Sequence, residues 1–223
     1  MYKFLWAVLL SALLCLVCCS PREELRSGDL IFVGIPADYS LDESSMESAI
    51  SAATGSGELN LIHVAIAEVD EHQAVWIIDA TIKHGVDRHP LSTFLEDFTL
   101  KDGSYPVFIV KRLKDNSQAP AFVEASKQYL GQSYDSAFLP DNDASYCTEL
   151  VYNSYRLSDG KPLFHAAPMN FRGPDGEFPL YWQQLFELIG QSIPQGIDGT
   201  NPQAMAAEDV LETVDVDLLN YLR

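Results

Sequence analysis

Residues 62–80 read IHVAIAEVDEHQAVWIIDA. Two apolar runs, at 62–69 and 74–80, flank a short polar stretch, and this pattern is typical of a β-hairpin. The first run contains His63, although a histidine inside an apolar strand is unfavourable unless a partner compensates it. The second run contains a carboxylate, Asp79. Whether these two side chains meet depends on the register of the hairpin.

The register follows from the length of the turn. If residues 70–72 form a three-residue loop, His63 lies directly opposite Asp79 on one face of the sheet. Glu68 alternates onto the other face and cannot serve this histidine. The sequence therefore predicts an imidazole–carboxylate pair, although a histidine that is only satisfied within a core would fit the same strand.

The rest of the chain alternates strands with helices. Two further apolar runs, at 29–34 and 106–113, are predicted strands. A proline at the start or a glycine at the end marks the predicted helices. These helices span 46–53, 90–98, 120–131 and 179–190, and a short one is expected at 206–211. This mixture, without a repeat or a long linker, predicts a single α+β domain over residues 20–223.

Cys147 is the only cysteine after residue 19. It lies in DASYCTELVYNSYRL, residues 143–157, where one helical stripe contains Cys147, Leu150, Val151, Ser154 and Tyr155. Asp143 or Ser145 can cap this helix, which places Cys147 in the first turn. Free backbone N–H groups and the helix dipole favour a thiolate there. A buried cysteine that only packs would fit the same stripe.

A nucleophilic cysteine needs a base, and this base is usually a histidine. Of the five histidines, only His63 stands inside an apolar strand. The other four are expected to be exposed residues of turns and loops, namely His72, His84, His89 and His165. His63 is therefore the candidate base.

Residues 1–19 have the layout of a secretory signal. They contain Lys3 followed by an apolar run that is too short for a typical transmembrane helix. The stretch LVCCS at 16–20 resembles a bacterial lipoprotein cleavage box, which would leave Cys19 as the lipid-bearing N-terminus. We expect a lipid-anchored protein of the bacterial cell envelope, periplasmic or on the outer surface. Cys147 then has no cysteine left for an intramolecular disulfide.

Composition argues against several partners and cofactors. The net charge of −18 disfavours nucleic acids and anionic lipid headgroups, and it fits either a solvated surface or the attraction of amine-bearing substrates. Residues 141–145, DNDAS, lack the glycine and the final glutamate of an EF-hand loop. The sequence shows no zinc spacing and no glycine-rich phosphate loop. We therefore expect no metal and no organic cofactor.

Five motifs follow one another in a defined order. They are GDLIF (28–32), HVAIAE (63–68), IIDATIKHGVDRHPLSTFL (77–95), GQSYD (131–135) and YCTELVYNSY (146–155). Together they resemble the circularly permuted NlpC-type cysteine peptidases, the YiiX group of the papain-like superfamily. The resemblance implies a permuted papain-like fold, in which an antiparallel sheet or half-barrel packs against the helix that bears the nucleophile.

The resemblance also implies roles for individual residues. Cys147 matches the nucleophile, His63 the base, and Asp79 the acidic third member, where the family more often has glutamate. Tyr134 matches a tyrosine whose hydroxyl lies near the oxyanion site, although a tyrosine packed on the following loop would fit its position too. Thr148 stands where serine is more usual.

Three functions are consistent with these residues. The first is a cysteine amidase or peptidase that hydrolyses short peptides, with cell-wall fragments as the expected substrates. The second is a thiol acyltransferase or lipid-acting hydrolase of the lecithin retinol acyltransferase type, although YCTE at 146–149 differs from the NCEH motif of those proteins. The third is a non-catalytic envelope binding protein, against which the set of candidate catalytic residues argues.

Lipidation of Cys19 can be tested by labelling cells with a fatty-acid analogue. We expect the wild-type protein to take up the label and the Cys19→Ala protein to lose it, because the thiol is the expected acylation site. Cys18→Ala leaves that thiol in place and should keep the label. Unchanged labelling of the Cys19→Ala protein would exclude this attachment site.

Overall fold

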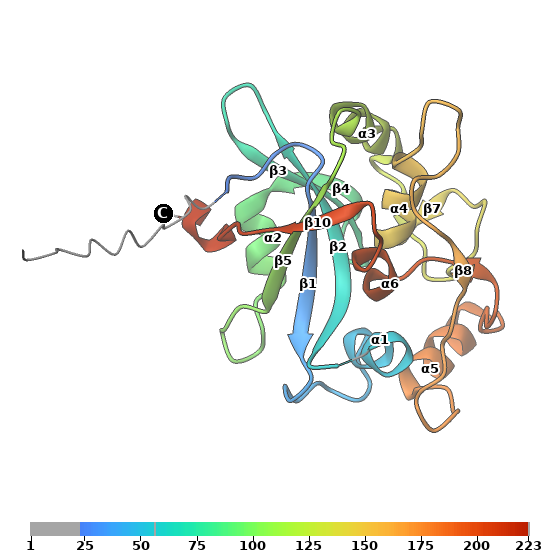
Figure 1. Cartoon of the computed structure of the whole chain (residues 1–223). Helices are drawn as coiled ribbons and strands as arrows, with labels where there is room; N and C mark the ends of the chain where they lie inside the picture. Colours follow the sequence, from blue (N-terminus) through green and yellow to red (C-terminus); the bar gives the residue numbers. More distant parts are fainter. Residues whose placement is uncertain (1–22, 56, 223) are drawn as a thin grey trace, which may run out of the picture.

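The structure is a computed structural model that describes residues 23–55 and 57–222 (Figure 1). The expected signal segment, with Cys19, lies outside the described residues. Within the described ranges, no helix is both long and apolar enough to span a bilayer.

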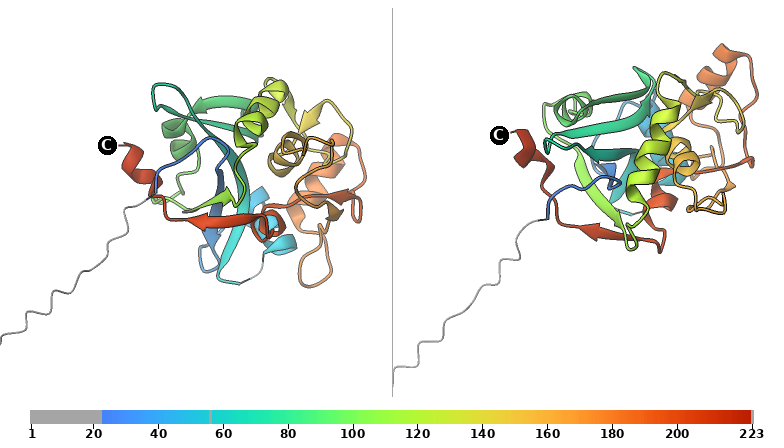
Figure 2. Two further views of the ribbon diagram at one scale, coloured as in Figure 1. Left: turned by 45° about the horizontal axis from the view of Figure 1, so that its top comes forward. Right: turned by 90° about the horizontal axis from the view of Figure 1, so that it is seen from above.

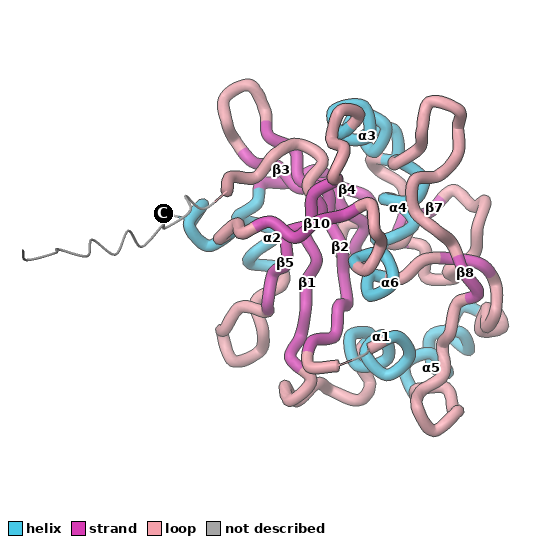
Figure 3. The backbone as a smooth tube through the Cα atoms, viewed as in Figure 1, coloured by secondary structure: helices cyan, strands magenta, loops and turns pink. Residues whose placement is uncertain are grey.

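In this part of the chain, six strands form one sheet in the order β10-β5-β1-β2-β3-β4, and all neighbouring strands are antiparallel. The strands are β1 (Leu30–Pro36), β2 (Leu59–Val69), β3 (Val75–Thr81), β4 (Gly85–Pro90), β5 (Val107–Leu113) and β10 (Leu211–Val214). Short strands form two separate pairs, β6 (Ser133–Tyr134) with β7 (Ala144–Ser145) and β8 (Ala167–Pro168) with β9 (Asp198–Gly199). The tube in Figure 3 shows that loops make up much of the molecule beyond the sheet.

Helices cover both faces of the sheet (Figure 2). They are α1 (Met46–Thr54), α2 (Leu91–Asp97), α3 (Ala119–Ser126), α4 (Cys147–Ser154), α5 (Leu180–Ile189) and α6 (Pro202–Ala206), with 3₁₀ turns η1 (Lys127–Tyr129) and η2 (Leu218–Leu222). Helices α3 and α4 share a core with Val64 and Ile66 on one face. Helix α2 covers the opposite face through Phe94 and Leu95. The two faces thus have separate cores, and the sheet lies between them.

The α+β fold with a large antiparallel sheet confirms the predicted class, but two strands of this six-stranded sheet escape prediction, as do the short strands of the two separate pairs. The sequence predicts β1, β2, β3 and β5. Strand β4 contains Asp87 and Arg88, and β10 contains Glu212, so neither has the apolar run that reveals the others. The helix expected at 206–211 is wrong, because the chain turns there and Leu211 begins β10.

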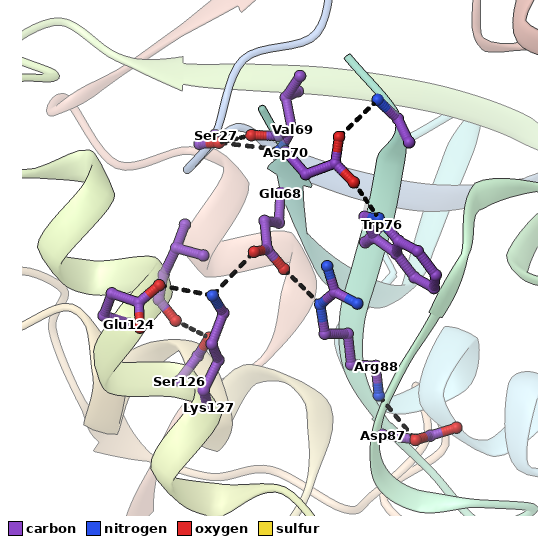
Figure 4. A network of polar contacts seen from close by, with 12 residues as sticks. Ser27, Glu68, Val69, Asp70, Trp76, Asp87, Arg88, Glu124, Ser126 and Lys127 are labelled. Atoms are coloured by element: carbon purple, nitrogen blue, oxygen red, sulfur yellow. Dashed lines mark hydrogen bonds and ion pairs between the residues drawn. The ribbon is translucent and has the colours of Figure 1, made fainter. Parts of the chain in front are cut away.

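The β2–β3 turn is longer than the predicted three residues. Val69 pairs with Val75, so the loop spans residues 70–74. The carboxylate of Asp70 closes this loop, because it accepts hydrogen bonds from a backbone N–H across the loop at 2.9 Å and from Trp76 Nε1 at 3.0 Å (Figure 4). The register is therefore shifted by two residues from the prediction. An even shift leaves every side chain on its predicted face.

Glu68 of β2 connects this strand with two further elements (Figure 4). Its side chain lies on the face of the sheet opposite His63, because side chains alternate along a strand. Its carboxylate lies 2.6 Å from Arg88 Nε in β4 and 2.8 Å from Lys127 Nζ in η1. The Arg88 guanidinium also lies 4.0 Å from the ring centre of Trp76. Networks of this kind contribute more than isolated surface pairs, so they help to hold the polar strand β4 against the sheet.

A buried cluster of ion pairs connects strand β5 with the residues just before β1. Arg112 of β5 contacts Asp29, just before β1, through Nε–Oδ1 and Nη2–Oδ2 distances of 2.7 Å. Arg112 also contacts the carboxylate of Glu23 and donates to the carbonyl of Glu24. This bidentate pair is buried, so the loss of one partner would leave the other charge buried without a counterion. The expected decrease in the free energy of unfolding is about 3–5 kcal/mol.

Gly85 is the first residue of β4, and it lies close to the backbone of Gln132. Its φ is +68°, and an ideal Cβ would lie 2.2 Å from the carbonyl oxygen of Gln132. We expect Gly85→Ala to lower the free energy of unfolding by about 2–5 kcal/mol, from backbone strain and overpacking together.

Gly103 provides the matched control, because its φ is +83° but nothing lies within 4 Å of its ideal Cβ. Gly103→Ala should cost only the strain, about 1–2 kcal/mol. Chemical denaturation of both variants makes the comparison. Equal losses would mean that the close approach of Gly85 to Gln132 contributes nothing.

Candidate active site

His63 and Asp79 meet across the hairpin. The Nε2 atom of His63 lies 2.7 Å from Oδ2 of Asp79, and both side chains are buried. They are diagonal neighbours rather than directly opposite residues, because the register is shifted by two from the prediction. Diagonal side chains on one face remain within reach of each other when they are long. The predicted contact therefore forms in spite of the wrong turn length.

The sheet opens at the level of this pair. The β2–β3 ladder ends at Ile66 and Ile78, although both strands continue beyond it. A bulge lies beside the opening, since β1 pairs with His63 and Leu61 but not with Ile62. Bulges turn neighbouring side chains and increase the twist of a strand. The base thus lies where β2 is both unpaired on its β3 side and locally bent.

Cys147 occupies the first position of helix α4. The cap residue before it is Tyr146, whose N–H faces the Glu149 carboxylate at 3.4 Å, so the expected capping by Asp143 or Ser145 is wrong. The apolar stripe of this helix is confirmed, because all five of its members are buried, namely Cys147, Leu150, Val151, Ser154 and Tyr155. Free N–H groups at a helix start favour negative charge beside them.

The thiol and the imidazole interact electrostatically. Burial alone would lower the pKa of His63, but attraction to Cys147 and hydrogen bonds to Asp79 and Cys147 raise this pKa to about 10. Asp79 already takes Nε2, so Nδ1 is the ring nitrogen left for the thiol. A histidine with this pKa is an imidazolium at neutral pH, and an imidazolium beside a cysteine favours the thiolate.

Tyr134 lies near Cys147, since both residues line the same two cavities. Burial raises the pKa of the Tyr134 hydroxyl well above its usual value, and Coulombic repulsion from Cys147 adds to the effect. The hydroxyl therefore stays protonated and can donate. Its one contact is weak, a sulfur atom of Met46 at 3.8 Å. The Tyr134 ring also packs edge-on near Phe138 of the following loop, which fits the reading of a packed tyrosine.

Cys147 and Tyr134 stand where two cavities meet. The larger cavity, of about 390 Å³, is also lined by His63 and the end of β3. The smaller one, of about 60 Å³, is an aromatic slot lined by Phe138, Phe171, Trp182 and Tyr146. The slot contains three buried polar atoms without a hydrogen-bond partner, which are Thr148 Oγ1, Thr200 Oγ1 and Trp182 Nε1. A substrate can therefore extend from the thiol in two directions.

One histidine differs from its prediction. His72, His84 and His165 are exposed as expected, but His89 is buried in β4. Its strand neighbour Asp87 pairs with Asp79, which places His89 on the same face as the candidate acid. Sequence reasoning misses His89 because β4 itself is missed. Recognition of 85–90 as a strand would have been the signal.

These positions bring together a cysteine at a helix start, a histidine and a carboxylate on preceding strands. Residues 24–215 match the protein family described as permuted papain-like amidase enzyme, YaeF/YiiX, C92 family. The chain belongs to this family. It is accordingly an enzyme of the cysteine peptidase and amidase class, with the permuted papain-like fold.

The chain is also similar to two individual relatives. The uncharacterized protein YiiX of Escherichia coli K12 is 24% identical over 192 residues, which cover 85% of each chain. A crystal structure described as metalloprotein YiiX, from Escherichia coli O157:H7, is 25% identical with a TM-score of 0.65. The similarity covers 86% of this chain and 97% of that one.

The name metalloprotein concerns that structure alone. In the described part of this permuted papain-like amidase, no group of three or more His, Cys, Asp or Glu side chains is placed to hold a metal ion.

Glu149 lies two residues after the thiol and is buried. Burial, and then the nearby carboxylate of Asp135, raise the pKa of Glu149 to about 8, although the N–H of Tyr146 opposes the shift. Asp141 adds further repulsion. At neutral pH this side chain is largely a neutral acid, so it adds little negative charge near Cys147.

Glu149 makes the stability of the amidase depend on pH. Its pKa is higher in the folded state than its ordinary 4.5, so the folded state binds the proton more tightly. This contribution is complete below pH 4.5 and disappears as the pH rises towards 8. We expect Glu149→Gln, which stays neutral, to stabilise the fold at pH 8 by about 1–3 kcal/mol and to change it little at pH 4.5.

Thermal unfolding at the two pH values measures this difference, which corresponds to roughly 3–10 °C in Tm at pH 8. The matched control is Glu187→Gln, at an exposed position of α5. It should leave Tm unchanged within about 1 °C. A Glu149→Gln protein no more stable than wild type at pH 8 would contradict the raised pKa.

Proposed function

We propose that the protein is a cysteine amidase that hydrolyses amide bonds in short peptides. Cys147 is the nucleophile, His63 carries the proton, and Asp79 orients His63. The observation that carries this proposal is the buried His63–Asp79 contact of 2.7 Å beside a thiol at a helix start. Membership of an amidase family supports the choice of an amide as substrate.

The first half-reaction forms a thioester. The thiolate of Cys147 attacks the amide carbonyl carbon, which forms a C–S bond and leaves negative charge on the carbonyl oxygen. The His63 imidazolium then donates its Nδ1 proton to the substrate nitrogen, the C–N bond breaks, and the amine leaves. Asp79 keeps the ring in this orientation and stabilises its positive charge.

The second half-reaction regenerates the site. A water molecule takes the place of the amine, and neutral His63 removes one of its protons as the oxygen attacks the thioester carbon. The C–S bond breaks, a carboxylic acid leaves, and the thiolate–imidazolium pair is restored. Both half-reactions therefore need the same ring nitrogen facing the thiol.

Two donors are available for the charge that develops on the carbonyl oxygen. The backbone N–H of Cys147 has no intrahelical acceptor, because it belongs to the first turn of α4. The hydroxyl of Tyr134 is buried beside the thiol and has only a weak sulfur contact. Donors fixed before the reaction are the effective kind, because they need no reorganisation.

The charges of the larger cavity support an amine-bearing leaving group. His63 lines this cavity, so the amine that it protonates must leave there. Apart from the catalytic His63, the wall contains Glu47, Glu96 and Asp97 and one further basic residue, Lys83, which is paired with Asp97. An acidic wall suits the second amino group of a diamino acid. Cell-wall peptides contain such residues, and an envelope protein anchored through Cys19 would encounter them.

A lipid-acting hydrolase is the second candidate, and one observation favours it. The aromatic slot next to Cys147 could hold the first carbons of an acyl chain. Its volume of about 60 Å³ leaves room for only a short apolar group. The slot thus suits a small apolar side chain of a peptide equally well.

The decisive experiment incubates full-length, detergent-solubilised protein with muropeptides, N-acyl amino acids and lipid esters, and detects products by mass. We expect cleavage of amide-linked peptides. Cys147→Ala should abolish it, with a loss on the order of 10⁴-fold or more. Asp79→Asn should slow turnover by about 10²–10⁴-fold, because His63 then loses its preferred tautomer.

His72→Ala is the control, since this side chain is exposed in the β2–β3 turn. It should retain wild-type turnover. Cleavage of esters alone would favour the lipid-acting alternative. Full activity of the Cys147→Ala protein would overturn the cysteine mechanism altogether.

A further inference from the structure

Only one of the two carboxylate oxygens of Asp79 has a hydrogen-bond partner. Its Oδ2 atom contacts His63, but its buried Oδ1 atom has no hydrogen-bond partner. A second imidazole faces this oxygen, since Nε2 of His89 lies 3.8 Å from Oδ1. A buried carboxylate oxygen without a donor is costly. Asp79 therefore lies between two imidazoles, one on each oxygen.

His89 likewise has a buried polar atom without a hydrogen-bond partner. Its ring is buried, and its Nδ1 atom has no hydrogen-bond partner. That atom lies 3.8 Å from Oδ2 of Asp87, a half-exposed residue of the same strand. Both ring nitrogens thus face carboxylates. A proton on Nε2 points an N–H towards Oδ1 of Asp79, which is the complement that this oxygen lacks.

The fold fixes His89 in this position. Ile77 pairs with His89 and Asp79 pairs with Asp87, so the acid and the second imidazole are diagonal neighbours on one face of the sheet. The face is the one that α2 covers. Neither Asp79 nor His89 lines the two cavities at Cys147. His89 can therefore act on the reaction only through Asp79.

We propose that His89 is a positioning residue of the active site, whose imidazole holds the second oxygen of Asp79 as His63 holds the first. The inference rests on the proposed function, because it extends the set Cys147–His63–Asp79 by one member. An imidazole facing the second oxygen opposes rotation of the Asp79 carboxylate away from His63.

The charged groups around His89 are few. Asp79 faces it from β3, and Asp87 faces it from its own strand. The His84 ring lies 6.2 Å from it between ring centres, and Asp97 of α2 binds His84 in turn. These groups are the ones that a pH profile of a His89 variant would report.

The experiment measures the alkylation rate of Cys147 by iodoacetamide in the full-length protein, read on the peptide that contains this cysteine. It needs no substrate. His89→Phe keeps the ring shape but removes the donor, and we expect the rate at pH 6 to fall about 10-fold. The acid limb of the rate profile should move to higher pH by about one unit, because the imidazolium opposite the thiolate is less stable.

Two further variants separate positioning from packing. His89→Gln restores an N–H donor and should return the rate to within about 3-fold of wild type. In an Asp79→Asn background, His89→Phe should change the rate less than 2-fold, because the residue through which it acts is already lost. His72→Phe, in the exposed turn, controls for the substitution itself and should match wild type.

Turnover provides the second readout. His89→Phe should lower kcat with little change in KM, since His89 does not line the cavities. An unchanged alkylation rate in His89→Phe, equal losses in His89→Phe and His89→Gln, or additive effects with Asp79→Asn would each overturn the proposal. Activity of Cys147→Ala would instead refute the proposed function, so the two failures are distinguishable.

Discussion

The contact between His63 and Asp79 depends on the alternation of side chains along two paired strands. Any even change in register keeps both residues on one face of the sheet, and any odd change separates them. The turn at 70–74 departs from the simplest loop by an even number, so the contact survives. Asp70 fixes that number with its own carboxylate. A surface residue of the turn therefore helps to set the strand pairing on which the buried site depends.

The rest of the site is arranged around the end of this pairing. Helix α4 packs on one face of the sheet, whereas the His63 ring contacts Phe98, with ring centres 4.7 Å apart, on the other face. Two groups on opposite faces can meet only where the sheet is interrupted. The ladder stops at Ile66 and Ile78, and the larger cavity lies there with Cys147 and His63 in its wall.

Sequence reasoning finds the residues with unusual surroundings and misses those that depend on a partner strand. A histidine in an apolar run and a lone cysteine on a helical stripe stand out without any structure. His89 does not stand out, because β4 is polar on one side and its burial comes from α2 and β3. The sequence likewise predicts a small polar cap for this helix, yet Tyr146 occupies the cap position and its ring packs near Phe138.

Glu149 lies close enough to the start of α4 to compete with Cys147 as an anion at this helix end. The few free N–H groups at the start of the helix can stabilise one anion. A carboxylate close to them would compete with the thiolate for these groups. With a pKa of about 8 for Glu149 and about 10 for His63, the competitor ionises before the imidazolium loses its proton. As the pH rises, Glu149 therefore becomes an anion first and competes for the N–H groups at the start of the helix. His63 loses its proton, and with it its positive charge, only at a higher pH.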